Sequence, residues 1–164
     1  MAIPDEQPEE FLITASHSDS PTFKVKANPE IADQLYVKLN VERYGGMLYA
    51  PWFDRPLSLA GRVVIKHEGK IASRLYIDEE PFCIIPSVAP HLDRAIEARE
   101  VDLRVDLSPV VSLDKEYDFN AYLAFKLALN REDILGFDLY LYPLQKGYIW
   151  GRDQEFFTCG HIDN

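Results

Sequence analysis

Apolar and polar residues alternate with a period of two along much of the first half of the chain, a pattern typical of half-buried β-strands. The alternation over residues 23–26 and 35–41 predicts two strands, joined by a turn over ANPEIADQ at residues 27–34. The apolar run FLITAS, at residues 11–16, predicts a short buried strand before them. The chain is therefore expected to begin as a series of strands.

The stretch LAGRVVIKHEGKIASRLYID predicts a β-hairpin. Residues 62–66 form one arm, the turn HEGK follows, and residues 71–77 form the other arm, so that His67 is expected to be solvated. FCIIP adds a strand that Pro86 closes. VDLRVDLSPVV, at residues 101–111, alternates as a half-exposed strand does.

The pattern changes to a helical one between residues 118 and 130. DFNAYLAFKLALN contains good helix formers, begins with an acid and places Tyr122, Phe125 and Leu129 on one side. A short capped turn is expected at residues 130–133. GFDLYLYPL then predicts a strand, KGYIWGRDQ a loop and EFFTCG a last strand. The predicted fold class is mainly β with one or two helices, α+β.

Composition narrows the class of protein. With 164 residues, of which 47% are hydrophobic and 27% charged, the chain can build one domain with its own core. A formal net charge of −10 disfavours nucleic acid as a partner. No apolar run approaches the length that spans a membrane, and residues 1–10 read as a polar leader without signal-peptide character. Cys83 and Cys159 form no metal or disulfide motif, so a reducing cytoplasm is expected.

Histidines with nearby aspartates are the main candidates for chemistry. They are His17 with Asp19, His91 with Asp93, and His161 with Asp163. A His-x-Asp pair after a strand suits a metal site, because imidazole is a common ligand and a carboxylate can orient it or bind the metal itself. The alternative for each is an ordinary surface or capping histidine. No nucleotide-binding or serine-nucleophile motif appears. Asp54-Arg55 is interpreted as a salt-bridged corner with Trp52 packed beneath it.

Five segments carry a resemblance to a known family. They are HSDSPTFKVK, NVERYGGMLYAPWFDRPLSLAGRVVI, IPSVAPHLDR, EDILGFDLYLYPLQKGYIWG and EFFTCGHIDN. In this order they resemble the aspartyl aminopeptidase/aminopeptidase I family of zinc metallopeptidases. The most specific parts are the His17–Pro21 motif, Tyr44-Gly45-Gly46, and WFDR running into LSLAGR.

The resemblance implies a domain organisation. Members of that family have an α/β catalytic domain that holds two metal ions and is interrupted by an inserted, mainly β domain used in assembly. Residues 11–21 and 153–164 would then be stubs of the catalytic domain, and residues 22–152 the β-rich dimerisation domain. The implied partners are a peptide substrate and further copies of the same chain.

The resemblance also implies roles for individual residues. His17 corresponds to a zinc ligand, delivered by FLITA as a strand of the catalytic domain, and Asp19 to the aspartate that orients that site. Asp163 corresponds to the aspartate that bridges the two metals. His91 matches a histidine of the assembly domain that reaches the active site of a neighbouring subunit and contacts the substrate there, although a strand-capping role is the alternative.

The chain departs from the family pattern at several positions. GHID at residues 160–163 replaces the usual Pro-Arg-Leu-Asp, and Pro90 changes the residue before His91. The family's general-base glutamate and further ligands follow beyond the position of Asn164. We therefore expect a segment of a dinuclear zinc aminopeptidase that releases N-terminal amino acids, acidic ones among the candidates, and that is inactive and self-associating on its own.

Two other functions stay open from the sequence. The chain could be a naturally short, non-catalytic assembly module related to the family. It could also be an autonomous binder of a single metal ion, which would require His17, His91 and His161 to converge.

Overall fold

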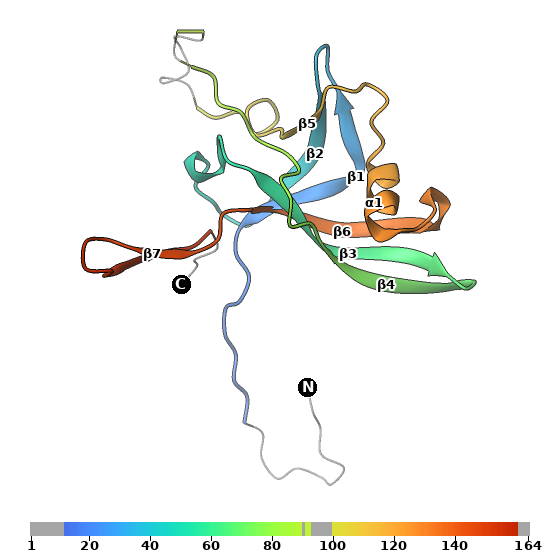
Figure 1. Ribbon diagram of the computed structural model, residues 1–164, viewed down its shortest axis with the longest axis horizontal. Coiled ribbons are helices and arrows are strands. Elements are labelled where there is room, and N and C mark those ends of the chain that lie inside the picture. The colour runs from blue at the N-terminus through green and yellow to red at the C-terminus, as the bar shows by residue number, and fades with distance from the viewer. Residues whose placement is uncertain (1–11, 90, 93–99, 161–164) are drawn as a thin grey trace.

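A six-stranded antiparallel sheet forms the body of the protein (Figure 1). The computed structural model describes residues 12–89, 91–92 and 100–160. The strands run in the order β4-β3-β6-β1-β2-β5, and one α-helix, α1, packs beside them. The described chain is therefore mainly β with a single α-helix, as the sequence predicts. The strands of this sheet are β1 (Thr22–Ala32), β2 (Val37–Tyr44), β3 (Leu57–His67), β4 (Lys70–Ile77), β5 (Val110–Ser112) and β6 (Ile134–Pro143).

β1 and β2 form a hairpin whose turn lies later than the sequence predicts. β1 continues through Ala32, and the chain reverses where the Asp33 N–H donates to the Tyr36 carbonyl at 2.9 Å. The register shifts between Val25 and Glu30, on either side of Pro29. Proline has no N–H for the ladder, and a bulge allows the strand to continue past it. The stretch expected as a turn is thus a bulged strand.

β3 and β4 form the predicted hairpin, paired without interruption from Ala60↔Ile77 to His67↔Lys70. His67 is exposed beside the turn, as expected. β3 pairs on its other side with β6, and this contact is close at Gly61. A Cβ at this position would lie 2.2 Å from the Asp138 carbonyl oxygen, and its φ of +150° also favours glycine. Glycine is therefore required where β3 crosses β6.

The segment Cys83 to Ile85 links β3, the neighbour of the end strand β4, to β5 at the other end of the sheet. Cys83 pairs with Leu57 of β3, and Ile84 pairs with Val110 of β5. Although FCIIP was predicted as a strand, it forms only these isolated bridges and a parallel one between Ile85 and Phe53. Through them the sheet curls into a ring, which encloses the core.

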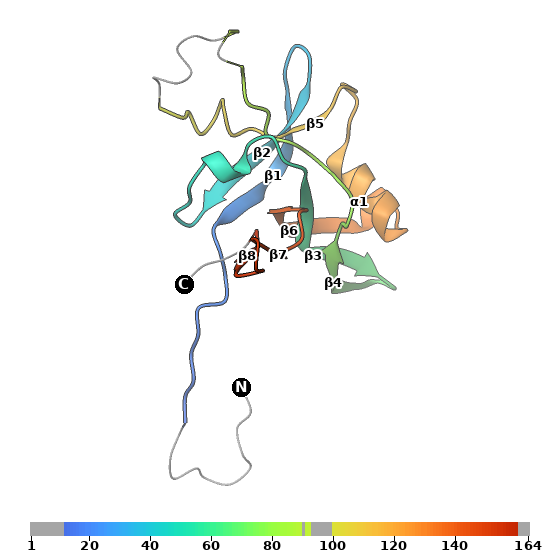
Figure 2. The same cartoon turned by 60° about the vertical axis from the view of Figure 1, so that its left-hand side comes forward.

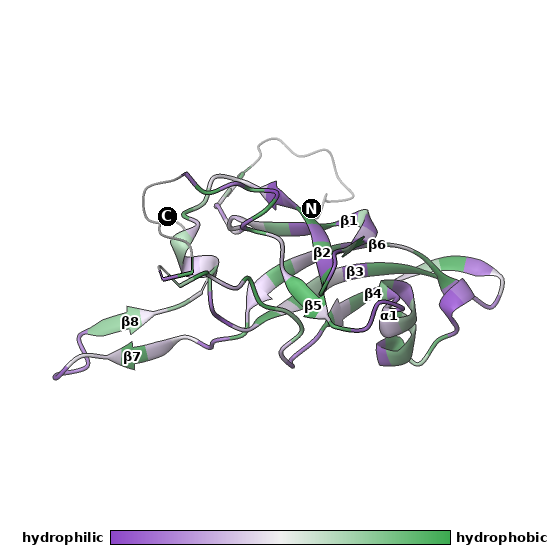
Figure 3. Cartoon of the chain, turned by 90° about the horizontal axis from the view of Figure 1, so that it is seen from above, coloured by the Kyte–Doolittle hydropathy of each residue, from purple (hydrophilic) through white to green (hydrophobic). Residues whose placement is uncertain are grey.

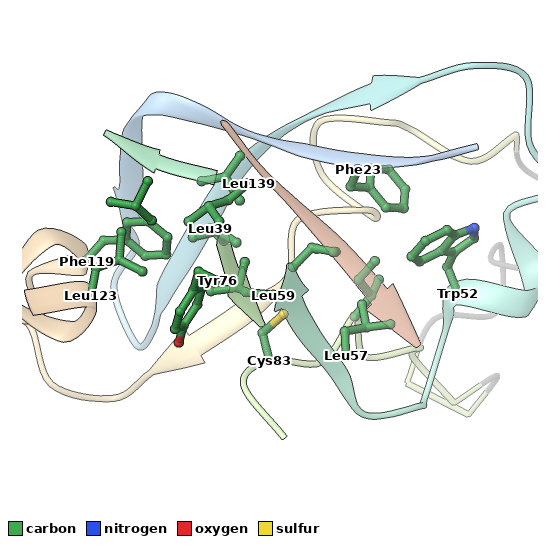
Figure 4. Packing of buried hydrophobic residues seen from close by; sticks show 14 of the residues in the cluster. Phe23, Leu39, Trp52, Leu57, Leu59, Tyr76, Cys83, Phe119, Leu123 and Leu139 are labelled. Carbon is green, nitrogen blue, oxygen red and sulfur yellow. The ribbon is translucent and has the colours of Figure 1, made fainter. Parts of the chain in front are cut away.

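The core fills the inside of this ring (Figure 4). Side chains from β1, β2, β3 and β6 contribute to it and alternate with more exposed neighbours over part of each strand, whereas Leu57, Ser58 and Leu59 at the start of β3 are all buried. Trp52, in the 3₁₀ turn η1 (Ala50–Trp52), packs edge-on against Phe23 with ring centroids 4.9 Å apart. The fully buried members include Leu39, Leu57, Leu59, Val63, Ile85, Leu107, Phe119, Leu123, Leu139 and Leu141.

Helix α1 (Phe119–Leu127) begins after Asp118, as the sequence predicts, but it ends three residues before the predicted end at Asn130. Asp118 accepts a hydrogen bond from the Ala121 N–H at 2.9 Å, and the helix stops at Ala128, whose φ is +54°. A 3₁₀ turn, η2 (Arg131–Asp133), follows. The buried face is the row that contains Phe119, Leu123 and Leu127, whereas Phe125 is 81% exposed. Of the row Tyr122, Phe125 and Leu129 that was predicted on one side, Tyr122 and Leu129 pack against the core and Phe125 does not. None of the helices in the described ranges is long and apolar enough to cross a bilayer.

A buried carboxylate attaches α1 to the sheet. Asp78, which is 5% exposed, follows β4 and accepts hydrogen bonds from the hydroxyl groups of Tyr76, at 3.0 Å, and Tyr122. Lys126 of α1 lies 3.2 Å from its other oxygen. The Asp78 carbonyl accepts from the hydroxyl groups of Ser58 and Tyr142. One residue thus receives hydrogen bonds from β3, β4, β6 and α1.

Two predicted strands are absent from the described residues. Residues 12–21 are extended, exposed for most of their length and paired with no strand, so the strand predicted for FLITAS is not formed. An apolar run becomes a strand only where a neighbouring strand accepts its hydrogen bonds. Residues 103–107 form turns, because the Asp102 carboxylate accepts from the N–H groups of Arg104 and Val105. Only β5 remains of the strand predicted over residues 101–111.

A second, two-stranded sheet projects from the body (Figures 1 and 3). It consists of β7 (Tyr148–Trp150) and β8 (Phe156–Thr158). β8 was predicted, but β7 was expected to be a loop; Gly151, with a φ of +101°, allows the reversal that joins them. Trp150 and Phe156 stack across the hairpin with centroids 5.0 Å apart.

Candidate metal and substrate site

The segment 12–21 meets the sheet through Asp19. The Tyr44 hydroxyl, at the end of β2, donates to Asp19 Oδ2 at 2.6 Å. This bond is the main reason why the pKa of Asp19 is lowered, and the same contact raises the pKa of Tyr44. Asp19 is therefore held as a carboxylate in a defined position even though it is exposed.

His17 contacts the other oxygen of the same carboxylate. Its Nδ1 lies 3.1 Å from Asp19 Oδ1. A carboxylate at Nδ1 fixes the tautomer and ring orientation of a histidine, and this arrangement is common where Nε2 binds a metal. The two residues predicted to act together in a metal site are thus in contact, and Tyr44 supports them from the sheet.

Two of the motifs singled out in the sequence meet at this point. Gly45, with a φ of +75°, turns the chain directly after Tyr44, and a Cβ placed on it would lie 3.5 Å from Pro21. The His17–Pro21 motif therefore lies against the Tyr44-Gly45 turn. The sequence marked both motifs, but it did not reveal that Tyr44 donates to Asp19. The only signal was a tyrosine that closes a strand before a glycine.

The third motif, WFDR at residues 52–55, fixes the chain a few residues before His91. Asp54, with a φ of +56°, accepts hydrogen bonds from the Ser87 N–H and hydroxyl at 2.8 and 2.5 Å. These bonds lower the pKa of Asp54. Trp52 is buried beneath, as predicted, but the carboxylate binds Ser87 instead of forming the predicted salt bridge with Arg55. The Asp54 corner thus anchors the chain a few residues before His91.

His91 lies on an exposed turn that is closed by the Leu92 N–H and the Ala89 carbonyl. In Figures 1 and 2 the chain that leads to this turn leaves the sheet on the opposite side from residues 12–21. Within one chain, His17 and His91 are therefore not brought together. His161 and Asp163 lie outside the described residues, and the part of the chain that is described contains no group of three potential metal ligands.

Comparisons with known proteins give a consistent family. The family model for aminopeptidase I zinc metalloproteases, M18, matches residues 3–164. A probable M18 family aminopeptidase 2 of Clostridium novyi (strain NT) is 40% identical over 163 residues, which cover 94% of this chain and 38% of the relative. The chain thus spans less than two fifths of the length of this curated relative.

Solved structures of aminopeptidases share the fold. The structure of Chaetomium thermophilum mApe1 superposes with a TM-score of 0.79 at 27% identity, over 90% of this chain and 37% of that one. The S. cerevisiae mApe1 dodecamer gives a TM-score of 0.67 at 28% identity, over 87% of this chain and 33% of that one. From the family match over nearly its whole length, together with this agreement in fold, the chain belongs to the aminopeptidase I (M18) family of zinc metalloproteases.

Proposed function

We propose that this chain is a segment of a dinuclear zinc aminopeptidase that releases N-terminal amino acids from peptides. The observation that supports it best is the contact of His17 with Asp19, whose carboxylate Tyr44 orients. The position of this pair in the His17–Pro21 motif agrees with the family match. We also propose that acidic N-terminal residues are among those that the enzyme releases.

The donors suit zinc. An imidazole whose Nδ1 is held by a carboxylate, together with a second carboxylate from Asp163, is chemistry that zinc prefers. When bound, zinc polarises the scissile carbonyl and lowers the pKa of a bound water. Asp19 keeps the imidazole of His17 in place through the contact at Nδ1. Because dinuclear binding needs more ligands and a general base, we expect no turnover from these 164 residues alone.

The same proposal assigns the domains. Residues 22–152 form the assembly domain, and residues 11–21 and 153–164 are parts of the catalytic domain that enter and leave it. Two features support this division. Leu12 and Ile13 are almost fully exposed. The β7–β8 hairpin, which spans the boundary between residues 152 and 153, exposes large apolar side chains that a packed catalytic domain would cover. These side chains are Tyr148, Ile149, Trp150, Phe156 and Phe157.

We further propose that the chain forms homo-oligomers in which His91 reaches the active site of a neighbouring subunit. His91 is exposed, and its segment and residues 12–21 lie on opposite sides of the sheet. A donor near the substrate carbonyl can hold the developing oxyanion, which would make activity depend on assembly. One solved relative, S. cerevisiae mApe1, is described as a dodecamer.

The experiment that tests the metal assignment is His17→Ala in the complete enzyme of which this segment is a part. We expect the bound zinc, measured by elemental analysis, and the turnover of aminoacyl anilides to fall together. His67→Ala is the matched control, because His67 is an exposed histidine at the end of β3. Full zinc content and full turnover in His17→Ala would show that the assignment is wrong.

A second variant tests His91. We expect His91→Ala to lower kcat while zinc content and oligomer size stay unchanged. If kcat of His91→Ala is unchanged, His91 does not act in catalysis and its role is structural. For the 164-residue chain itself, the assay with aspartyl, glutamyl and leucyl anilides plus zinc, cobalt or manganese should give no turnover, and metal-dependent turnover that His17→Ala removes would contradict the proposal.

A further inference from the structure

β4 presents an open edge and an uncovered apolar face. It is an end strand of the six-stranded sheet, and in the described part of the chain its outer edge pairs with no other strand (Figure 1). One face of β4 carries three exposed apolar side chains. These are Ile71, Leu75 and Ile77, which are 77%, 88% and 62% exposed. The opposite end strand, β5, has only three residues and is bridged by Ile84. β4 is therefore the long free edge of this sheet.

Natural edge strands usually carry features that prevent pairing with another chain. β4 lacks most of these features. It contains no proline, its eight residues pair with β3 without a bulge, and no described segment covers it. The Arg74 side chain is turned toward α1, where it donates to the Leu127 carbonyl at 3.2 Å. An uninterrupted strand with an apolar outer face is suited to pairing with another strand.

We infer that β4 pairs antiparallel with β4 of a second copy, around a two-fold axis at Ser73. This assigns a contact surface to the self-association proposed above and rests on it. Residues directly opposite each other in an antiparallel sheet lie on the same face. An axis between two successive residues would place residues of opposite faces against each other, so the two-fold axis must pass through a residue. Centred on Ser73, the pairing places Ile71 opposite Leu75 of the second copy, twice by symmetry. It also places Ala72 opposite Arg74.

Charge distinguishes this register from its neighbours. An axis at Arg74 would place two arginines directly opposite each other, and an axis at Ala72 would place Lys70 opposite Arg74. Like charges in directly opposite positions destabilise a sheet. The Ser73 register has no such pair and still pairs residues 70–76 of both copies. A second copy of the same strand is thus a complementary occupant for this edge.

Cross-linking tests the register. Ser73→Cys is made in a Cys159→Ser background, because Cys159 is exposed whereas Cys83 is buried. Residues that face each other across an antiparallel pair have Cβ atoms close enough for a disulfide. On mild oxidation we expect most of the chain to run as a covalent dimer on a non-reducing gel. Ala72→Cys, which reports the register with its axis at Ala72 and keeps both Lys70 and Arg74, and His67→Cys, which reports random collision, should cross-link about tenfold less.

Light scattering tests the surface. Leu75→Glu places a charge on the apolar face of β4, and we expect the dimer dissociation constant to rise about tenfold or more. Leu48→Glu is the matched control, because Leu48 is similarly exposed, at 80%, but lies away from β4. Circular dichroism should be unchanged in both variants.

The outcomes separate this inference from the proposed function. A dimer that forms without the Ser73 cross-link, or that Leu75→Glu leaves intact, overturns the β4 interface but not self-association. Stronger cross-linking of Ala72→Cys than of Ser73→Cys overturns the register. A strict monomer at high micromolar concentration overturns both self-association and the interface, whereas the zinc assignment depends on the His17→Ala experiment alone.

Discussion

Replacing Asp78 with alanine should destabilise the fold more than replacing any exposed carboxylate. The substitution removes the acceptor for the hydroxyl groups of Tyr76 and Tyr122 and the partner of Lys126, which then stay buried or half-buried without it. Each hydrogen bond to a charged group contributes about 1.5–3 kcal/mol, and removing one partner of a buried ion pair costs about 3–5 kcal/mol. These contributions overlap, so we expect a loss of about 4 kcal/mol.

The loss can be measured by thermal unfolding followed by circular dichroism. For a chain of this size, 1 kcal/mol corresponds to a shift in Tm of about 2–4 °C, so Asp78→Ala should lower the Tm by about 8–16 °C. Glu79→Ala is the control, since Glu79 is the exposed neighbouring carboxylate and should change the Tm little. If the Tm of Asp78→Ala stays within about 2 °C of the wild-type value, the hydrogen bonds to Asp78 do not stabilise the fold.

The same residue makes stability depend on pH. Burial raises the pKa of Asp78, but hydrogen bonds from Tyr122, Tyr76 and Lys126 lower it more, so the pKa lies below its usual value. Its stabilising effect is present above the unfolded-state pKa of about 3.9 and is lost as the pH falls through the folded-state pKa. The difference in unfolding free energy between wild type and Asp78→Asn should therefore be constant near neutral pH and shrink below about pH 4. A difference that grows on acidification would contradict this reasoning.

Two further substitutions test local structure. Gly61→Ala should destabilise the fold by about 2–4 kcal/mol, because its Cβ would meet the Asp138 carbonyl oxygen at 2.2 Å. Gly46→Ala is the control, since no atom lies within 4 Å of its Cβ. Equal denaturation midpoints for the two variants would contradict the close contact at Gly61. Asp118→Ala removes the acceptor for the Ala121 N–H and should cost about 1 kcal/mol in urea unfolding, whereas Asp118→Asn should retain most of the cap. Equal losses in both variants would show that the cap hydrogen bond is not the cause.

Local patterns predicted the elements that depend on local interactions. The β3–β4 hairpin and α1 were predicted because alternation, helix formers and the cap at Asp118 act within a few residues. Of the apolar row predicted on one side of α1, Tyr122 and Leu129 contact the core but Phe125 is exposed. Phe119 and Phe125 are equally apolar, and only the packing of Phe119 on Phe82 and Phe137 decides which one is buried.

The errors arose where a distant or competing partner decides the structure. Residues 101–107 alternate like a strand, but Asp102 offers their N–H groups a nearer acceptor. In the candidate site the sequence suggested His17 and Asp19, which are in contact. It did not suggest Tyr44 as the donor to Asp19, because 25 residues separate the two and no periodic pattern links them.

The position of β6 in the sheet has a consequence for how the chain folds. The hairpins β1–β2 and β3–β4 are local and can form early. In the described sheet β6 lies between β3 and β1 and pairs with both hairpins, whereas on the other side they are linked only through the isolated bridges of Cys83 and Ile84. β6 pairs with β3 from Leu57↔Pro143 to Ile65↔Ile134, and the Thr22 hydroxyl donates to the Leu141 carbonyl across 119 residues. Contacts between such distant parts of a chain form slowly. On a ribosome, both hairpins would therefore wait with open edges until residues 134–143 emerge, and this interval is the stage at which a chaperone would protect the nascent chain most.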